Sequence, residues 1–124
     1  MLGIEWQHDG KILVVAPQGK LAVEDFDRLA DEVDAYLEEQ GELNGLLIEA
    51  EAFPGWQDFA ALLSHLGFVK EHHQKIHKVA AVTDSGFLAI LPKVAGLFLK
   101  AEVKHFPYHD RPAAVAWLMA GQPE

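Results

Sequence analysis

Cysteine is absent from this sequence of 124 residues, and serine occurs only as Ser64 and Ser85. Without cysteine the chain has no disulfide bond, no thiol nucleophile and no cysteine-ligated metal, a composition that fits a reducing compartment. Neither serine lies in a Gly-x-Ser-x-Gly setting, and the Gly-x-Gly-x-x-Gly pattern of a phosphate-binding loop does not occur. We therefore expect neither enzymatic activity nor a bound cofactor.

Basic residues are also few. Ten lysines and arginines stand against 19 acidic residues, which gives a formal net charge of -9. The imbalance is local: the first 60 residues hold 14 acidic and 3 basic residues, and the rest hold 5 and 7. Because phosphate backbones are bound by clustered Lys and Arg, we expect no nucleic-acid partner. The mildly basic second half leaves a membrane surface open as a partner.

A signal-peptide pattern is also missing, since the opening residues MLGIEWQHDGK do not join a basic region to an apolar core. Half of all residues are hydrophobic, which is typical of a folded globular chain. No repeat, low-complexity tract or interdomain linker interrupts the sequence. These features predict a single domain over residues 1–124, located in the cytoplasm.

The apolar periodicity predicts strands that alternate with helices. The expected elements are a β-hairpin around the turn at residues 8–10, a helix over 23–40, a strand over 45–48, a helix over 57–73, a strand over 76–83, a helix within 86–100, a strand over 101–106 and a last helix that starts near Asp110. The order β-β-α-β-α-β-α-β-α predicts an α/β domain, with a mostly parallel sheet that the opening hairpin makes mixed.

Four short motifs resemble the SpoIIAA-like family of bacterial proteins, which is related to the STAS domains. They are Phe53-Pro54-Gly55-Trp56, residues 78–84, residues 98–106 and Ala116-Trp117-Leu118. The element order matches the family over nearly the whole chain. The resemblance implies a STAS-like fold, in which four α-helices flank a five-stranded mixed β-sheet. It also implies the binding of an apolar ligand or a membrane rather than catalysis.

The same resemblance raises the question of a phosphoserine switch. Anti-anti-sigma factors, which are regulatory STAS domains, carry a phosphorylatable serine where the helix after the middle strand begins. Residues 53–58 occupy that region here and contain neither serine nor threonine, so we expect no such switch. Ser85 follows the next strand, and we interpret it, or Asp84 before it, as a helix N-cap.

Two groups of polar residues deserve a chemical interpretation. Four histidines lie close in sequence (His65, His72, His73 and His77). We expect a solvated helix end rather than a metal site, because no second-shell support for a metal-binding set is evident in the sequence. Glu49, Glu51 and Asp58 follow a predicted parallel strand, at the end where open α/β sheets place their sites. Acid–base chemistry there is the alternative to a solvated acidic loop.

The segment from Phe87 to Leu99 is apolar except for Pro92, Lys93 and Gly96. As a helix it would span about 20 Å, and it is shorter than the roughly 20 residues that cross a membrane. Proline inside a helix costs about 3 kcal/mol. Either a helix begins near Ser85 and kinks at the proline, or a separate turn precedes a helix that begins close to Pro92. Both arrangements predict a loosely anchored element.

On a continuous helix this segment is apolar on more than one side. The stripe suited to packing on the sheet is Phe87, Leu91, Val94 and Phe98, and the residues left over are Leu88, Ile90, Leu97 and Leu99. A surface helix of a monomer would carry polar residues at the leftover positions.

Three interpretations of the leftover residues remain open. The leftover residues pack on neighbouring helices or a dimer partner, they close an apolar pocket, or they insert into a membrane surface with Lys93, Lys100 and Lys104 near the head groups.

We expect a non-catalytic protein that binds an apolar small molecule or lipid and uses the mobile apolar helix within 86–100 as a lid. The predicted ligand-binding residues come from this segment and the helix before it: Trp56, Phe59, Leu63, Phe87, Ile90, Leu91, Val94 and Phe98. Such a carrier would meet the membrane periphery to load its ligand. The alternative is a protein–protein interaction or homodimerisation module that uses the same apolar surface.

Overall fold

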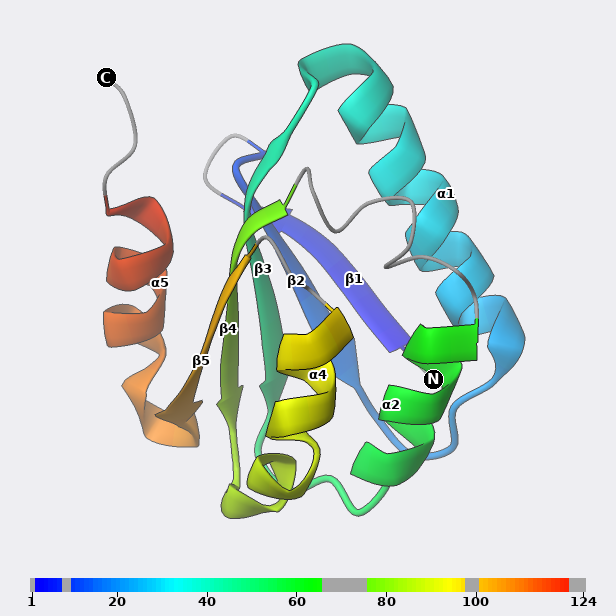
Figure 1. Cartoon of the computed structure of the whole chain (residues 1–124), viewed down its shortest axis with the longest axis vertical. Helices are drawn as coiled ribbons and strands as arrows, with labels where there is room; N and C mark the ends of the chain where they lie inside the picture. The colour runs from blue at the N-terminus through cyan, green and yellow to red at the C-terminus, as the bar shows by residue number, and fades with distance from the viewer. Residues whose placement is uncertain (1, 8–9, 66–75, 98–100, 121–124) are drawn as a thin grey trace.

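The computed structural model describes residues 2–7, 10–65, 76–97 and 101–120 of the chain. They form one five-stranded sheet whose strands follow the chain order (Figure 1). The strands are β1 (Leu2–Gln7), β2 (Ile12–Pro17), β3 (Leu43–Ala50), β4 (Ile76–Thr83) and β5 (Glu102–Pro107). β1 pairs antiparallel with β2, and all later neighbours pair parallel. The mixed sheet that the sequence predicts is confirmed.

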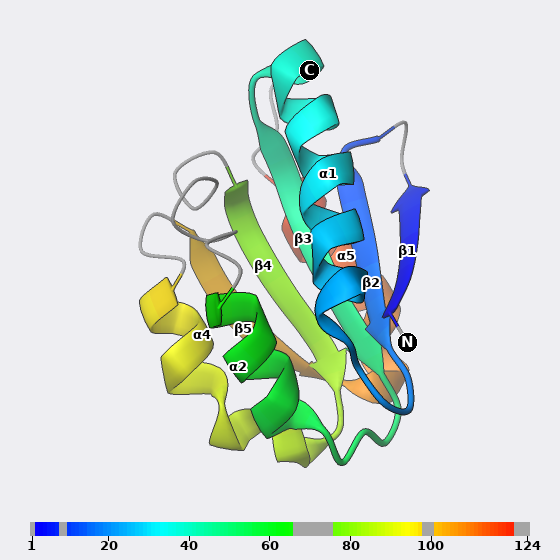
Figure 2. The same ribbon diagram turned by 90° about the vertical axis from the view of Figure 1, so that its right-hand side faces the viewer.

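Helices cover both faces of this sheet. The described residues form four α-helices and two short 3-10 helices: α1 (Val23–Gln40), α2 (Trp56–His65), η1 (Ser85–Ala89), α4 (Leu91–Leu97), η2 (Tyr108–Asp110) and α5 (Arg111–Met119). Helices α1, α2 and α4 lie on one face and α5 on the other (Figures 1 and 2). The predicted α/β, STAS-like order of elements is confirmed, although residues 66–73 of the second predicted helix lie outside the described residues.

Each face of the sheet has its own apolar core. Phe26, Phe59 and Phe87 are fully buried on the face that α1, α2 and α4 cover. On the other face, Leu118 of α5 is buried against β3 and β4. The middle residues of β3 and β4 are buried in succession because these strands lie between two helical layers. Of the described helices, none is both long and apolar enough to span a membrane.

Helix α1 begins and ends as its sequence predicts. The Asp25 carboxylate accepts a hydrogen bond of 3.0 Å from the Ala22 backbone N–H, which satisfies a donor at the helix start. At the other end, Gly41 adopts φ 86° and donates to the Leu37 carbonyl at 2.8 Å. The buried stripe of the helix consists of Phe26, Leu29, Val33 and Leu37. Because this stripe faces the sheet, the acidic residues are left on the remaining sides.

The third helical region is divided in two. η1 precedes α4, and Pro92 is the second residue of α4, where its missing N–H removes no helical hydrogen bond. The second of the two predicted arrangements is therefore confirmed. Phe87, Ile90 and Val94 are at most 2% exposed, so three core side chains anchor the described part of this region. The expectation of Ile90 as a leftover surface residue is wrong, whereas Leu88 is indeed 48% exposed. The predicted mobility of this region stays a prediction.

Candidate functional site

The carboxyl ends of four strands meet at one edge of the sheet. β2, β3, β4 and β5 are parallel to one another, so the segments that follow them leave at the same edge, at the bottom of Figure 1. Open α/β sheets place ligand sites at this edge because rigid strands position the loops there. The candidate site of this chain lies there.

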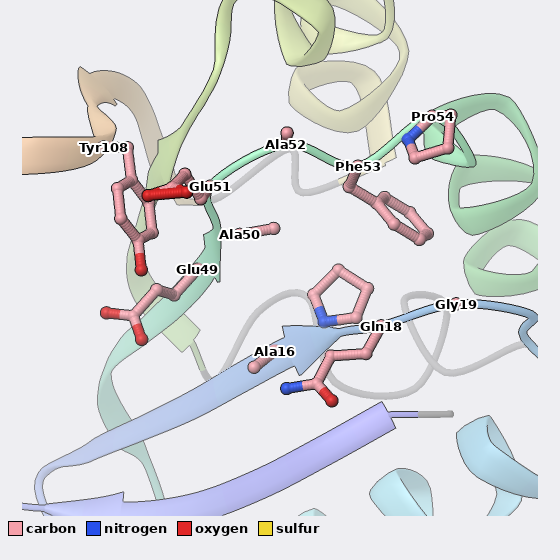
Figure 3. Close-up of a pocket in the computed structure, with 11 residues that line it drawn as sticks. Ala16, Gln18, Gly19, Glu49, Ala50, Glu51, Ala52, Phe53, Pro54 and Tyr108 are labelled. Carbon is pink, nitrogen blue, oxygen red and sulfur yellow. The ribbon is translucent and has the colours of Figure 1, made fainter.

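A hollow of about 420 Å³, here called the edge hollow, opens where β2 and β3 end. Its lining comes from residues 16–19, residues 49–54 and Tyr108. Figure 3 shows Tyr108, Glu49 and Glu51 at one end of this hollow and Phe53 and Pro54 at the other. The edge hollow is therefore polar at one end and apolar at the other.

Glu49 has a structural partner in this hollow. Arg111 Nη1 lies 2.6 Å from Glu49 Oε2, and the two side chains are 35% and 21% exposed. Arg111 is the first residue of α5, so the ion pair connects the end of β3 to the start of α5. Glu51 is exposed at the hollow, whereas the predicted third acid, Asp58, is exposed in the first turn of α2 and is no part of its lining.

The carboxylate of Asp84 joins the loops that follow β3 and β4. Its Oδ2 accepts a hydrogen bond from the Phe53 N–H at 3.2 Å, and its Oδ1 accepts from Trp56 Nε1 and from the Gly86 N–H, each at 3.1 Å. The bond from Gly86 caps η1, so Asp84 and not Ser85 is the N-cap. With three donors satisfied, this carboxylate positions the site rather than offering a free acceptor to a ligand.

The Phe53-Pro54-Gly55-Trp56 motif forms a ridge beside the edge hollow. Phe53 is buried, and a Cβ on Gly55 would lie 2.8 Å from the end of its ring, which explains the glycine. The ring of Trp56 packs edge-on against Phe53 at 4.9 Å between centroids, and Pro54 is exposed. The motif thus fixes one buried aromatic side chain on each side of an exposed proline.

A second hollow of about 420 Å³, here called the Trp56 hollow, lies on the other side of this ridge. Its lining is Ala52, Phe53, Pro54, Trp56, Gln57, Asp84 and Gly86. The two hollows share residues 52–54, so they form one continuous surface along the carboxyl-terminal edge. The Trp56 hollow is the more apolar of the two, because aromatic and small side chains supply most of its lining.

The structure brings together five of the eight predicted ligand-binding residues. Trp56, Phe59, Phe87, Ile90 and Val94 are buried in one cluster, with the Trp56 ring 5.5 Å from Phe59 and 5.1 Å from Phe87. They form the core among α2, η1 and α4, and Trp56 also lines a hollow. Their role as a ligand wall stays a prediction.

The remaining three predicted residues divide differently. Leu91 is half-buried against the same core. Phe98 and the side chain of Leu63 lie outside the described residues.

The lysines assigned to a membrane-facing surface do not gather on one side. Lys104 Nζ lies 5.1 Å from the centroid of Phe106 and 6.0 Å from that of Trp117, on the α5 face of the sheet. Lys93 is exposed on α4, which covers the opposite face (Figure 1). The predicted grouping of these two lysines is therefore wrong, and Lys100 lies outside the described residues.

The histidines offer little support for a metal site. His77 Nε2 lies 2.9 Å from Glu42 Oε2, and both side chains are largely exposed. His72, His73 and the side chain of His65 lie outside the described residues. Within the part of the chain that the structure describes, no three histidine or acidic side chains are grouped closely enough to hold a metal ion.

Several residues of the site escaped the sequence analysis. Gln18 and Tyr108 line the edge hollow, and Arg111 holds its glutamate. The sequence does indicate that these residues lie at the carboxyl-terminal edge, because each of them follows the end of a predicted strand within a few residues. It does not indicate that they belong to a site, since nothing in the local sequence distinguishes them from other loop residues.

Comparison with known proteins agrees with the fold, and the matched region of the chain includes the candidate site. A search of curated proteins found no match. A family model described as SpoIIAA-like matches residues 12–119, which run from the start of β2 to the end of α5 and include every residue that lines the two hollows. With the five-stranded mixed sheet, the helices on both faces and the Phe53–Trp56 ridge in place, the chain belongs to the SpoIIAA-like family.

Proposed function

We propose that this chain is a non-catalytic protein-interaction module of the STAS type, and that its partner binds the carboxyl-terminal edge of the sheet. The observation that carries the proposal is the pair of adjoining hollows, each of about 420 Å³, on either side of the exposed Pro54. Two neighbouring hollows suit two side chains of one partner segment, in the way that interface pockets receive anchoring residues.

The polar groups at this edge favour binding over reaction. Glu49 is paired with Arg111, and Asp84 accepts three hydrogen bonds from its own chain. Neither carboxylate is thereby poised as a free acid or base beside a nucleophile. Family membership supports the same conclusion, because SpoIIAA-like domains belong among the STAS-related interaction modules.

Site-specific photo-crosslinking in cells tests the proposal. A photoreactive phenylalanine analogue replaces Glu51 at the edge hollow, and in a separate protein it replaces Glu38, which is exposed on α1. We expect a discrete crosslinked partner from position 51, at several times the yield from position 38. Mass spectrometry of the adduct then identifies the partner, or identifies a second copy of this chain and thus a homodimer.

Equal crosslinking at the two positions would contradict the proposal, because position 38 shares the acidic surroundings but lies away from both hollows. Adding Pro54→Arg to the position-51 protein supplies a further control. A bulky cation on the ridge between the hollows should reduce the specific adduct severalfold and leave the helical circular dichroism unchanged, because Pro54 is exposed.

A second candidate function is the binding of an apolar small molecule or lipid, with η1 and α4 as the lid. The observation that favours it is Leu88, which is 48% exposed next to the buried Phe87 and so presents an apolar side chain to the surroundings. The photoreactive residue at position 88 distinguishes the two candidates: a lipid adduct there, with none at position 51, would favour the carrier. Peripheral membrane contact and a cytoplasmic location in a bacterium remain part of this proposal.

A further inference from the structure

A separate hollow of about 360 Å³ lies between β1 and α1, and none of its residues belongs to the two hollows at the carboxyl-terminal edge. Here called the aromatic hollow, it is lined by Trp6, Gly10, Glu32, Ala35, Tyr36 and Glu39. The rings of Trp6 and Tyr36 stack with their centroids 4.6 Å apart and their planes inclined by 24°. Figure 2 shows β1 at the edge of the sheet, near α1.

Helical spacing places both carboxylates of the lining beside these rings. Glu32, Tyr36 and Glu39 follow one another at four and three residues, so they share one side of α1. This side adjoins the buried stripe of the helix, which explains why Tyr36 is half-buried and the glutamates border it. The hollow therefore combines a neutral aromatic surface with two negative charges.

Gly10, which lies shortly before β2, completes the hollow. Gly10 adopts φ 83°, and a Cβ at this position would lie 3.2 Å from Tyr36 Cε2. Glycine thus permits both the left-handed backbone and the close approach of residue 10 to the ring. Burial raises the pKa of the Tyr36 phenol above its ordinary value of 10.0, so the ring remains uncharged at neutral pH and adds no further negative charge.

The charges around the hollow are strongly one-sided. Residues 23–40 of α1 include eight acidic residues and a single basic one, Arg28. Arg28 Nη2 donates a hydrogen bond to the Leu2 carbonyl, so this guanidinium already binds the backbone of β1. A surface of this sign attracts cations and raises their local concentration.

We propose that the aromatic hollow binds an arginine side chain that a basic segment of a protein partner presents. A guanidinium is planar, stacks on aromatic rings and pairs with carboxylates through several N–H donors, which matches the two rings and two glutamates. A lysine ammonium is more strongly hydrated and carries no planar face, so it matches the stacked rings less well. This interaction surface is additional to the proposed partner site at the edge hollow and uses none of its residues.

The test is a titration of the ¹⁵N-labelled protein, at low ionic strength, with a blocked glycine–serine peptide that contains one central arginine. The readouts are the Trp6 indole N–H and the Gly10 amide. We expect saturable shifts at millimolar peptide, because one exposed cation–π contact with flanking charges gives only weak binding. The same peptide with citrulline, which has the shape of arginine without its charge, should bind at least about fivefold more weakly.

Matched variants place the interaction on the two glutamates. Glu32→Gln with Glu39→Gln should weaken arginine-peptide binding about fivefold. The control, Asp27→Asn with Glu38→Gln, removes two charges from the exposed opposite side of α1 and should change the affinity less than about twofold. All four changes are conservative at exposed or half-exposed helix positions, so circular dichroism should stay the same.

Three results would overturn the proposal. Equal affinity for the arginine and citrulline peptides would exclude recognition of the charge. Equal losses in the two double variants would mean that the general field of α1 attracts the peptide and that the hollow does not. Equal binding of a lysine peptide would exclude the stacking of a guanidinium on the rings.

Discussion

At the scale of a single residue, the pKa of the Tyr36 phenol tests whether this ring is buried. Desolvation raises its pKa above the ordinary value of 10.0, because burial disfavours the phenolate. The chain has two tyrosines, so in Tyr108→Phe the absorbance change at 295 nm reports Tyr36 alone. We expect its titration midpoint above pH 10 in the folded protein and a lower midpoint in urea.

The sign of the linked stability effect follows from this shift. The folded-state pKa is raised, so the protonated phenol stabilises the folded protein below pH 10, and that contribution is lost as the pH rises through the folded-state pKa. The free energy of unfolding should therefore fall with pH above about 10 by more than it falls in Tyr36→Phe. A folded-state midpoint at or below that in urea would contradict the burial of this ring.

Single residues also mark the limit of prediction from sequence. Gly55 could be expected in a loop, but its reason, the ring of Phe53 at 2.8 Å, depends on the packed structure. The same holds for Asp84: a capping role was predicted, and its bonds to the Phe53 N–H and the Trp56 indole were not. Local sequence gives a capping preference, whereas a contact between residues 28 positions apart requires the fold.

At the scale of elements, α5 packs on β3 through a glycine. A Cβ on Gly45 would lie 2.9 Å from Leu118 Cδ2 and 3.1 Å from Leu118 Cβ. Gly45→Ala should therefore lower the free energy of unfolding by about 1–3 kcal/mol, because the helix must move away from the sheet or Leu118 must leave its rotamer. Urea denaturation followed by circular dichroism measures this change.

Gly96 supplies the matched control for that substitution. It lies in α4, is exposed, and a Cβ there would have nothing within 4 Å. Gly96→Ala should leave the stability unchanged or raise it by up to about 1 kcal/mol, since alanine is the better helix former. Equal effects of the two substitutions would show that the close approach of α5 to β3 has been assigned wrongly.

The accuracy of the predicted elements depends on how local their signals are. The bounds of α1 match the prediction because the features that indicate them are local. They are the apolar spacing, the acidic first turn and Gly41 directly after the last helical residue. β3 was predicted over residues 45–48 and extends over Leu43–Ala50, because its end residues pair with Ile76 and Thr83 of β4. Pairing partners distant in sequence are not visible to a local pattern.

The region around Pro92 shows how a wrong helical phase misplaces a residue. A continuous helix from residue 86 puts Ile90 on the surface. In the structure η1 ends before Ile90, which adopts φ -107° and ψ -1°, and α4 begins at Leu91. The change from a 3-10 to an α-helical repeat turns Ile90 into the core, where it is 2% exposed.

For the whole molecule, the sequence analysis placed an acid–base alternative at the edge where the edge hollow opens, but it did not select most of the lining residues. The rule that sites gather at the carboxyl ends of parallel strands selected Glu49 and Glu51, and both line the edge hollow. The other side of that hollow comes from Gln18 and Tyr108, which the sheet brings together from the ends of β2 and β5. Such a site can be predicted only after strand order is known, and the sequence left that order open.

Strand order also predicts how stability is distributed over the molecule. β3 and β4 are each hydrogen-bonded to two neighbouring strands and covered by helices on both faces, whereas β1 and β5 have one neighbour each among the described strands. Amides in the middle of β3 and β4, such as those of Leu47 and Ala80, should therefore exchange with solvent only through global unfolding. Amides of β1 and β5 are expected to exchange through local opening, on the order of 100-fold faster.

Native-state hydrogen exchange at increasing urea concentrations measures this difference. The exchange free energies of β3 and β4 amides should fall with urea at the slope of global unfolding, while those of β1 and β5 stay flat until the two sets converge. If β1 or β5 followed the global slope from the start, its free edge would have to be covered in solution, since an unpaired edge strand opens more easily than a central one. The edge involved would then identify the surface through which this domain associates with a second copy or a partner.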